Sequence, residues 1–227
     1  MTNGSSITRS KSARRTDQQQ SFHLSATVCF AVFLLCLLSS SCKESALDGR
    51  RLSLPDSLWL RNGDLIFRMG EAWFSHYFRD IASDEKQYSH VGLIEIDYNG
   101  KTLVYHCEDY AAAGHQGVCV EPIDSFMMTS SAVGIYRFHN LSEGDCGRIV
   151  QRAKNYLRQR VPFDYKFDSE SDEQLYCTEF VVNCLREAPV IGQIGQRLSF
   201  FGRKVYGLDD LYRLPFCTPV WLSASKK

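Results

Sequence analysis

A short polar stretch between two apolar runs constrains the fold of this chain more than any other feature. The apolar runs cover residues 91–96 and 103–107, and Asp97-Tyr98-Asn99-Gly100-Lys101 separates them. Turn residues between two such runs predict an antiparallel β-hairpin. Gly100 suits the left-handed backbone position that closes a three-residue loop.

The length of this loop decides which side chains face each other across the hairpin. A three-residue loop pairs Asp97 with Lys101, so that His90 falls opposite Glu108 and His106 lies diagonally on the same face. A two-residue Asn-Gly loop would shift the pairing by one residue and turn both candidates away from His90. We therefore predict the three-residue register.

Two reactive residues each begin an element. His90 opens what reads as a buried strand, and Cys177 opens what reads as an amphipathic helix. The N-terminus of a helix stabilises a thiolate, and an imidazole can take the proton of a thiol. Such pairs are defined by geometry and not by order along the chain, so Cys177 and His90 are a candidate nucleophile and base.

Bulk composition excludes other classes of protein. The 227 residues carry 26 basic and 26 acidic side chains, and 44% are hydrophobic. This length fits one globular domain with an appendage. The balanced charge gives no support for nucleic-acid binding, which usually requires a basic face.

The appendage lies at the N-terminus. Residues 1–23 are polar with a basic cluster, residues 24–38 are apolar, and Ser39-Ser40-Ser41-Cys42 follows. This order is typical of a secretory signal, and the apolar run is shorter than the ~20 residues of a membrane-spanning helix. Cys42 after three serines resembles the lipidated cysteine of a bacterial lipoprotein, although Ser39 stands where that pattern prefers an aliphatic residue. An uncleaved N-terminal anchor is the alternative.

On this interpretation the chain has three parts. Residues 1–42 are a lipoprotein-type signal segment, residues 43–60 are a tether, and residues 61–218 form the folded domain. We expect the domain to lie in the cell envelope, held to the membrane by the N-terminal lipid or anchor.

Cysteine spacing predicts neither a metal site nor a disulfide framework. The chain has nine cysteines, and no spacing of Cys or His is typical of zinc ligands. If Cys42 carries lipid and Cys177 is the nucleophile, five remain outside the apolar run and cannot all pair. Most are expected to be small buried residues.

The hydrophobic periodicity predicts an α+β domain with a mainly antiparallel sheet. The expected strands lie within residues 61–68 and over Val91–Ile96, Leu103–Cys107, Gly117–Pro122 and Ala132–Phe138. The expected helices lie over residues 71–82 and Ile123–Met128, after an N-cap at Ser142 with Asp145 three places on, and from Cys177 to about Ala188. Residues 192–215 give no clear pattern beyond one helical turn at Asp209–Tyr212.

Six short strings in this order resemble one protein family. They are Gly63-Asp64-Leu65-Ile66-Phe67-Arg68, Tyr88-Ser89-His90-Val91-Gly92, Val104-Tyr105-His106-Cys107, Val120-Glu121-Pro122-Ile123, Pro162-Phe163-Asp164-Tyr165-Lys166-Phe167 and Tyr176-Cys177-Thr178-Glu179. Their order is similar to that of the YiiX/YaeF-like permuted papain-like amidases, relatives of the NlpC-type cell-wall peptidases. The resemblance covers residues 60–187 and implies a circularly permuted papain-like (NlpC-type) fold with helices flanking the sheet.

The resemblance also implies catalytic roles. Cys177 would be the nucleophile and His90 its base. The family's third polar residue lies on the strand after the histidine, where this chain has His106 in place of an acidic residue. String matching favours His106 and the hairpin register favours Glu108, so both are candidates for the residue that orients His90.

The expected chemistry is acyl transfer by a thiolate, with the backbone N–H of Cys177 as oxyanion donor and with no metal or organic cofactor. Kinship with NlpC-type enzymes implies peptidoglycan-type peptides as substrates. Lipid acyl amides or esters are the alternative on the same scaffold, and a non-catalytic binding lipoprotein is the alternative from another class. His115 falls in an apparent loop and is assigned no role.

Overall fold

A computed structural model describes residues 52–70, 79–80, 83, 85–110, 114–128, 130–188, 191–192, 194–200 and 202–223. The chain divides into two units, Met1–Arg50 and Arg51–Lys227, and the first lies wholly outside the described residues. The predicted signal segment with Cys42, the start of the tether and most of the predicted helix 71–82 therefore lie outside them as well. No helix within the described residues has the length and apolarity needed to cross a membrane.

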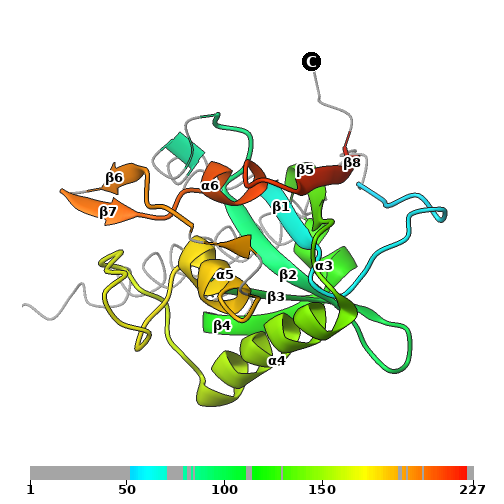
Figure 1. Ribbon diagram of the computed structural model, residues 1–227, viewed down its shortest axis with the longest axis horizontal. Helices are drawn as coiled ribbons and strands as arrows, with labels where there is room; N and C mark the ends of the chain where they lie inside the picture. The colour runs from blue at the N-terminus through cyan, green and yellow to red at the C-terminus, as the bar shows by residue number, and fades with distance from the viewer. Residues whose placement is uncertain are drawn as a thin grey trace, which may run out of the picture. The chain divides into compact units, whose positions relative to one another are not determined.

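Six strands form one antiparallel sheet (Figure 1). Their spatial order is β4-β3-β2-β1-β5-β8. The strands are β1 (Leu65–Gly70), β2 (His90–Ile96), β3 (Thr102–Tyr110), β4 (His115–Pro122), β5 (Ser130–Phe138) and β8 (Cys217–Leu222). A separate two-stranded ribbon pairs β6 (Leu198–Phe200) with β7 (Arg203–Val205). The expected antiparallel sheet is thus confirmed.

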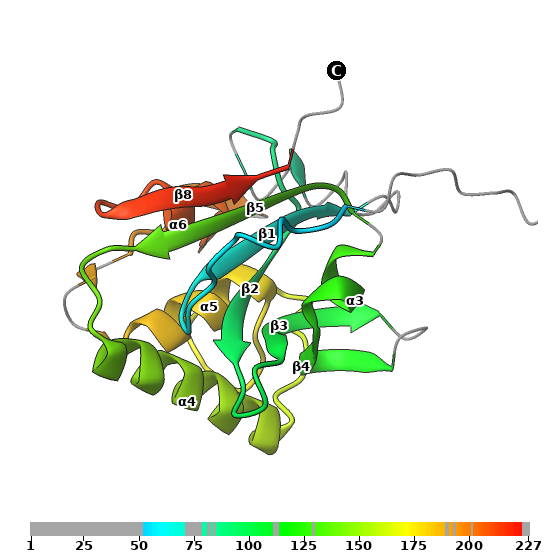
Figure 2. The same cartoon turned by 90° about the vertical axis from the view of Figure 1, so that its right-hand side faces the viewer.

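Helices cover both faces of this sheet (Figure 2). The long helix α4 (Glu143–Gln159) and the helix α5 (Cys177–Leu185) pack on one face, and α3 (Ile123–Met127) packs on the other. Helix α6 (Asp209–Tyr212) is the helical turn expected from the sequence. Each face therefore has its own apolar core.

Helix α4 begins where the sequence predicts. The side chain of Ser142 accepts a hydrogen bond from the backbone N–H of Asp145, and the Asp145 carboxylate accepts from Ser142 N–H, which is a capping box. Lys154 on the same helix donates to Glu95 of β2 at 2.5 Å and fastens the helix to the sheet.

The hairpin between β2 and β3 has the predicted three-residue register. Asp97 N–H donates to the Lys101 carbonyl at 2.9 Å, and Gly100 has a φ of 78°. The ladder pairs Gly92 with His106 and Ile94 with Val104. His90 therefore lies on the same face as His106, as expected.

Alternation along β2 separates its two faces. Val91 and Leu93 belong to the core beneath α4 and α5, whereas Ile94 belongs to the core beneath α3. His90 shares the α3 face, where its ring lies 5.7 Å from that of Phe126.

The structure differs from the sequence prediction at His115, at strand β8 and at the end of helix α5, among other places. His115 is the first residue of β4 and not part of a loop, because β3 runs on to Tyr110 and the two residues pair. The sequence does not predict strand β8; it is an edge strand with Pro219 inside it, and edge strands tolerate proline. Helix α5 ends at Leu185, before the predicted Ala188.

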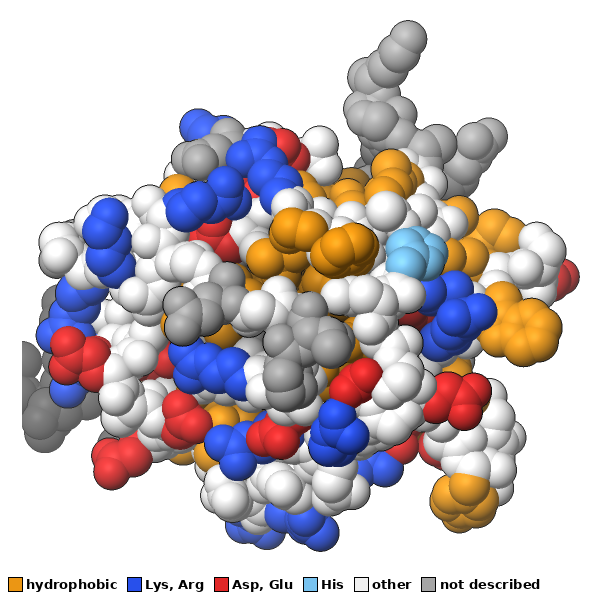
Figure 3. Space-filling view, in the orientation of Figure 1, with side chains coloured by type: hydrophobic (Ala, Val, Ile, Leu, Met, Phe, Trp, Pro, Cys, Tyr) orange, Lys and Arg blue, Asp and Glu red, His pale blue; other side chains and the backbone are white. Residues whose placement is uncertain are grey.

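Charged side chains of both signs lie scattered over the face of the molecule shown in Figure 3. This mixture agrees with the equal numbers of basic and acidic residues in the chain, 26 of each. Hydrophobic side chains also reach this surface, as they do on most folded proteins.

Gly117 lets β4 approach the segment that leads to α5. It forms an isolated bridge with Pro162, and Val118 N–H donates to the Val161 carbonyl at 2.9 Å. A Cβ at position 117 would lie 2.2 Å from the Val161 oxygen, and the φ of Gly117 is 140°. Only glycine fits this close contact.

We therefore expect Gly117→Ala to lower the free energy of unfolding by about 2 kcal/mol or more, because the added methyl group collides with backbone. Chemical denaturation monitored by circular dichroism measures this change. The matched control is Gly147→Ala on the exposed face of α4, where a Cβ meets nothing within 4 Å. That control is expected to stabilise the protein by about 0.5–1 kcal/mol, and equal effects at the two sites would contradict the account.

Candidate active site

The chain before α5 holds Cys177 in place through backbone and side-chain contacts. Leu175 N–H donates to the Pro162 carbonyl at 3.0 Å, and the Cys107 thiol donates to the Leu175 carbonyl at 2.9 Å. Tyr176 is the N-cap residue, and its buried hydroxyl accepts from Tyr206 N–H at 2.9 Å. Cys177 is thus the first helical residue, as predicted.

Backbone N–H groups point at the sulfur of Cys177. Burial raises the pKa of the Cys177 thiol to about 12, and the N–H groups of Thr178 and Val91 oppose that rise. Amides at the start of a helix lack intrahelical acceptors, so they are available to an anion. The sulfur is therefore a thiol in the folded protein at neutral pH.

The contact with Val91 brings the sulfur to the residue after His90. At this end, the last residue pair between β2 and β3 is Gly92 with His106, so Val91 lies outside the paired region. The sulfur therefore lies at the His90 end of β2, outside the paired part of the β2–β3 ladder. No hydrogen bond joins the sulfur to the His90 ring among the described residues.

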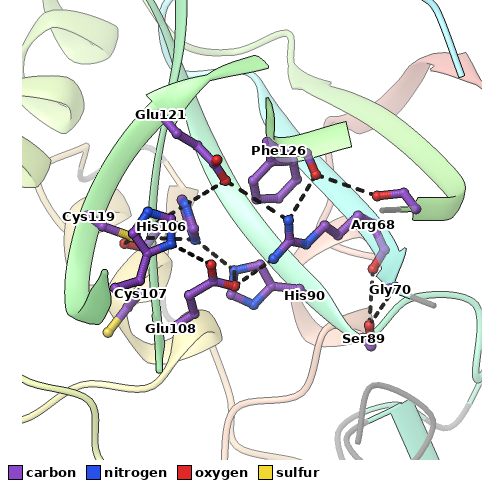
Figure 4. A network of polar contacts seen from close by, with 12 residues as sticks. Arg68, Gly70, Ser89, His90, His106, Cys107, Glu108, Cys119, Glu121 and Phe126 are labelled. Carbon is purple, nitrogen blue, oxygen red and sulfur yellow. Dashed lines mark hydrogen bonds and ion pairs between the residues drawn. The ribbon is translucent and has the colours of Figure 1, made fainter. Parts of the chain in front are cut away.

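The His90 ring is held by a second histidine. His90 Nε2 lies 3.0 Å from His106 Nδ1, and the two rings meet edge to face. The other nitrogen of His106, Nε2, lies 3.1 Å from Glu121 Oε1. Figure 4 shows this row of three side chains, with the second nitrogen of His90 directed away from it. His90 Nδ1 has no hydrogen-bond partner among the described residues.

Glu108 lies on the same face but is engaged elsewhere. Its Oε2 accepts from Arg68 Nη2 at 2.5 Å, and its Oε1 lies 2.7 Å from His115 Nδ1. The distance from Glu108 Oε2 to His90 Nε2 is 3.8 Å, which is too long for a hydrogen bond. Of the two candidates left open by the sequence, His106 makes the direct contact.

Both central histidines are neutral in the folded protein. Burial lowers the pKa of His90 well below 6.5, and nearby Arg68 lowers it further. Burial also lowers the pKa of His106, although the hydrogen bond to Glu121 opposes this. Burial raises the pKa of Glu121, but the contact with His106 and the charge of Arg68 outweigh it, so this carboxyl stays ionised.

These charge states order the protons along the row. An ionised carboxylate only accepts hydrogen bonds, so the proton of neutral His106 lies on Nε2, facing Glu121. Its Nδ1 is then an acceptor and takes the hydrogen bond of His90 Nε2–H. The lone pair of His90 is consequently on Nδ1, the nitrogen that points away from His106 and is free to accept a proton.

A further group of side chains could hold a metal ion. His106, Glu108, His115 and Cys119 each offer one donor atom, and these four atoms lie within 4.8 Å of one another. The sequence analysis assigns no role to His115 and finds no spacing of Cys or His that is typical of metal ligands. The group arises from the pairing of β3 with β4, which sets His106 beside Cys119 and Tyr110 beside His115.

Sequence reasoning also missed Glu121 as a partner of His106. The only signal was the place of Glu121 in one of the six family strings. Alternation along a strand does not say which residue lies opposite until the register with the neighbouring strand is known. The β3–β4 register supplies that information by pairing Val104 with Glu121, two places from the pair of His106 and Cys119.

Glu179 is a buried acid on α5, two residues after Cys177. It is 1% exposed, and its Oε2 has no hydrogen-bond partner within the described part of the chain. Burial raises its pKa to about 8, while a hydrogen bond from Tyr176 N–H lowers it. Glu179 is therefore protonated in the folded protein at neutral pH.

Comparison with known proteins identifies the family. Residues 59–212 match the family described as "permuted papain-like amidase enzyme, YaeF/YiiX, C92 family", and the chain belongs to it. The protein is thus a cysteine hydrolase of the peptidase and amidase type. Comparison with curated proteins finds no match.

A solved structure supports the fold. The metalloprotein YiiX from Escherichia coli O157:H7 superposes with a TM-score of 0.56 at 20% sequence identity, over 73% of this chain and 97% of that one. The circularly permuted papain-like fold expected from the six strings is confirmed.

The buried acid Glu179 predicts a pH dependence of stability. A carboxyl whose pKa is raised from 4.5 to about 8 on folding holds its proton more tightly when folded, so stability falls as pH rises from 4.5 to about 8. We expect Glu179→Gln to remove a slope of up to about 1.4 kcal/mol per pH unit in this range. Denaturation at several pH values measures the slope. Exposed Glu173→Gln is the control, and an unchanged slope in Glu179→Gln would refute the assignment.

Proposed function

We propose that this protein is a cell-envelope cysteine hydrolase that cleaves amide bonds of peptidoglycan-type peptides, with Cys177 as nucleophile and His90 as base. The observation that carries the proposal is the row His90–His106–Glu121, which leaves an unpaired nitrogen on His90 beside the strand end where the Cys177 sulfur lies. Membership of an amidase family supports the reaction class. The solved relative YiiX is described as a metalloprotein, but no step of the hydrolysis proposed for this chain uses a metal.

The first half-reaction forms an acyl enzyme. His90 Nδ1 takes the proton of the Cys177 thiol as the sulfur attacks the carbonyl carbon of the amide, and a C–S bond forms. The negative charge that develops on the carbonyl oxygen is stabilised by the backbone N–H of Cys177 at the start of α5. The imidazolium then gives its proton to the amine nitrogen, the C–N bond breaks, and the amine leaves.

Water completes the cycle. His90 Nδ1 takes a proton from water, the hydroxide that forms attacks the thioester carbon, and the C–S bond breaks. The thiolate recovers its proton from His90, and the carboxylic acid product leaves. The bonds and protons balance without an oxidant, reductant or second substrate.

His106 and Glu121 position the base. The hydrogen bond from His90 Nε2 to His106 Nδ1 fixes the tautomer of His90, and Glu121 fixes that of His106. When His90 becomes an imidazolium, the ionised Glu121 stabilises the charge through His106. Arg68 binds Glu108 at 2.5 Å, which holds Glu108 away from His90 and so leaves this role to Glu121.

The proposed substrate and location rest on the N-terminal segment. If the signal is of the lipoprotein type, lipid would be attached to Cys42. Residues 43–60 would then be a tether between the membrane and the domain. Cell-wall peptides are amide-rich polymers within reach of such a tether. Lipid acyl amides and esters are the competing substrate class, and they also lie at the membrane.

The substrate test is release of peptide fragments from purified cell wall, measured by mass spectrometry. We expect fragments from the wild-type protein and none from Cys177→Ala, because the other thiol near these histidines, that of Cys119, contacts His106 and is not at the start of α5. Cys217→Ala is the matched cysteine control. Turnover of acyl lipids without fragment release would overturn the peptide assignment, and equal activity of Cys177→Ala would overturn the nucleophile.

Alkylation of Cys177 by iodoacetamide tests the order of protons in the row. Glu121→Gln is expected to slow labelling by about 10-fold or more, because an amide can donate to His106 and favour the wrong tautomer. Glu121→Asp should recover part of the rate, and His90→Ala sets the lower limit. Site-mapped mass spectrometry measures the rate across pH 6–9. A larger loss in Glu108→Gln than in Glu121→Gln would assign the orienting role to Glu108 instead.

A further inference from the structure

The His106 ring lies among donor atoms of other side chains, and together these atoms suit one kind of metal ion. Two imidazoles, a thiol and a carboxylate converge there, from His106, His115, Cys119 and Glu108. Nitrogen and sulfur donors with one carboxylate favour Zn²⁺, which is borderline soft, over Mg²⁺ or Ca²⁺, which prefer all-oxygen ligand sets.

The spacing of the donor atoms is within about 1 Å of that of a zinc site. Tetrahedral zinc with bonds of about 2.0–2.3 Å places its donors roughly 3.3–3.7 Å apart. Here the Cys119 sulfur lies 3.3 Å from His106 Nε2, and Glu108 Oε1 lies 2.7 Å from His115 Nδ1. All four donor atoms lie within 4.8 Å of one another, so shifts of about 1 Å would complete the site.

A neighbouring arginine orients one of these ligands, and three of the four are partly exposed to solvent. Arg68 holds Oε2 of Glu108 and thereby turns Oε1 toward His115. Glu108, His115 and Cys119 are partly exposed, whereas His106 is fully buried beneath them. Three of the four ligands are therefore accessible from solvent.

Ligation by His106 is incompatible with the proton order that catalysis needs. If the metal binds Nε2, the proton of neutral His106 moves to Nδ1, which must then donate to His90 Nε2. The remaining proton of His90 then lies on Nδ1, and the base has lost its lone pair. If the metal binds Nδ1 instead, it takes the atom that His90 Nε2 contacts at 3.0 Å. Either ligation disables His90.

We propose that Zn²⁺ binds His106, Glu108, His115 and Cys119 and switches the hydrolase off by capturing the imidazole that orients His90. The coupling to catalysis rests on the proposed function of Cys177 and His90. The binding itself does not, because none of the four ligands is the nucleophile or the base. The site would keep the enzyme inactive wherever zinc is available and release it where zinc is scarce.

Binding is tested without any substrate. Full-length Cys177→Ala protein is stripped with a chelator and titrated with Co²⁺, a spectroscopic substitute for Zn²⁺. We expect a thiolate-to-cobalt charge-transfer band in the near ultraviolet that added Zn²⁺ abolishes. The band should be absent in Cys119→Ser and weakened in His115→Gln, and it should persist in the control Cys217→Ser. Absence of the band, or its persistence in Cys119→Ser, would overturn the site.

Coupling is tested by alkylation of Cys177 in the full-length protein with the native thiol. Equimolar Zn²⁺ is expected to slow iodoacetamide labelling by about 100-fold, the lower range of what a positioned base contributes, and a chelator should restore it. In Cys119→Ser the ratio of rates with and without Zn²⁺ should approach one. Cobalt binding with no effect of Zn²⁺ on labelling would overturn the switch. Slow labelling in metal-free wild type would instead count against the proposed function.

Discussion

The register of the β2–β3 hairpin is the constraint on which the rest of the site depends. Asp97 pairs with Lys101 around a loop that Gly100 closes, and this pairing sets His106 on the same face as His90. A shift of one residue would send both His106 and Glu108 to the face covered by α4 and α5. The Cys177 sulfur contacts the Val91 N–H on β2, beyond the last β2–β3 pair at Gly92 and His106.

Charge and burial then give the hairpin its chemistry. Two buried imidazoles in contact must share protons in one order, and an ionised Glu121 at one end decides which order is adopted. In the proposed mechanism, the half-buried Cys177 thiol, whose pKa is raised to about 12, depends on that order for its activation. The same His106 ring lies among metal-type ligands, so the proposed catalysis and the proposed zinc binding would compete for one side chain.

Much of this arrangement could be predicted from local sequence. Turn chemistry at Asn99-Gly100 indicated the register, the Ser142 and Asp145 pair indicated the start of α4, and six ordered strings indicated the family and fold. Glu121, His115 and Cys119 could not be placed, because their positions depend on how β3 pairs with β4. The residues that join these strands, 111–114, are three alanines and Gly114, a sequence that does not specify the register as Asn99-Gly100 does. Long-range pairing, and not local propensity, assembles this half of the site.

The order of protons in the His90–His106 row is the central claim, and nuclear magnetic resonance of ¹⁵N-labelled histidine rings measures it directly. In chelator-treated protein at neutral pH, we expect both imidazoles to be neutral with the proton on Nε2 and an unprotonated Nδ1. Assignment of the signals follows from His90→Ala and His106→Ala. A proton on Nδ1 of His90 in the metal-free protein would contradict the account, because that nitrogen could not then accept the proton of Cys177.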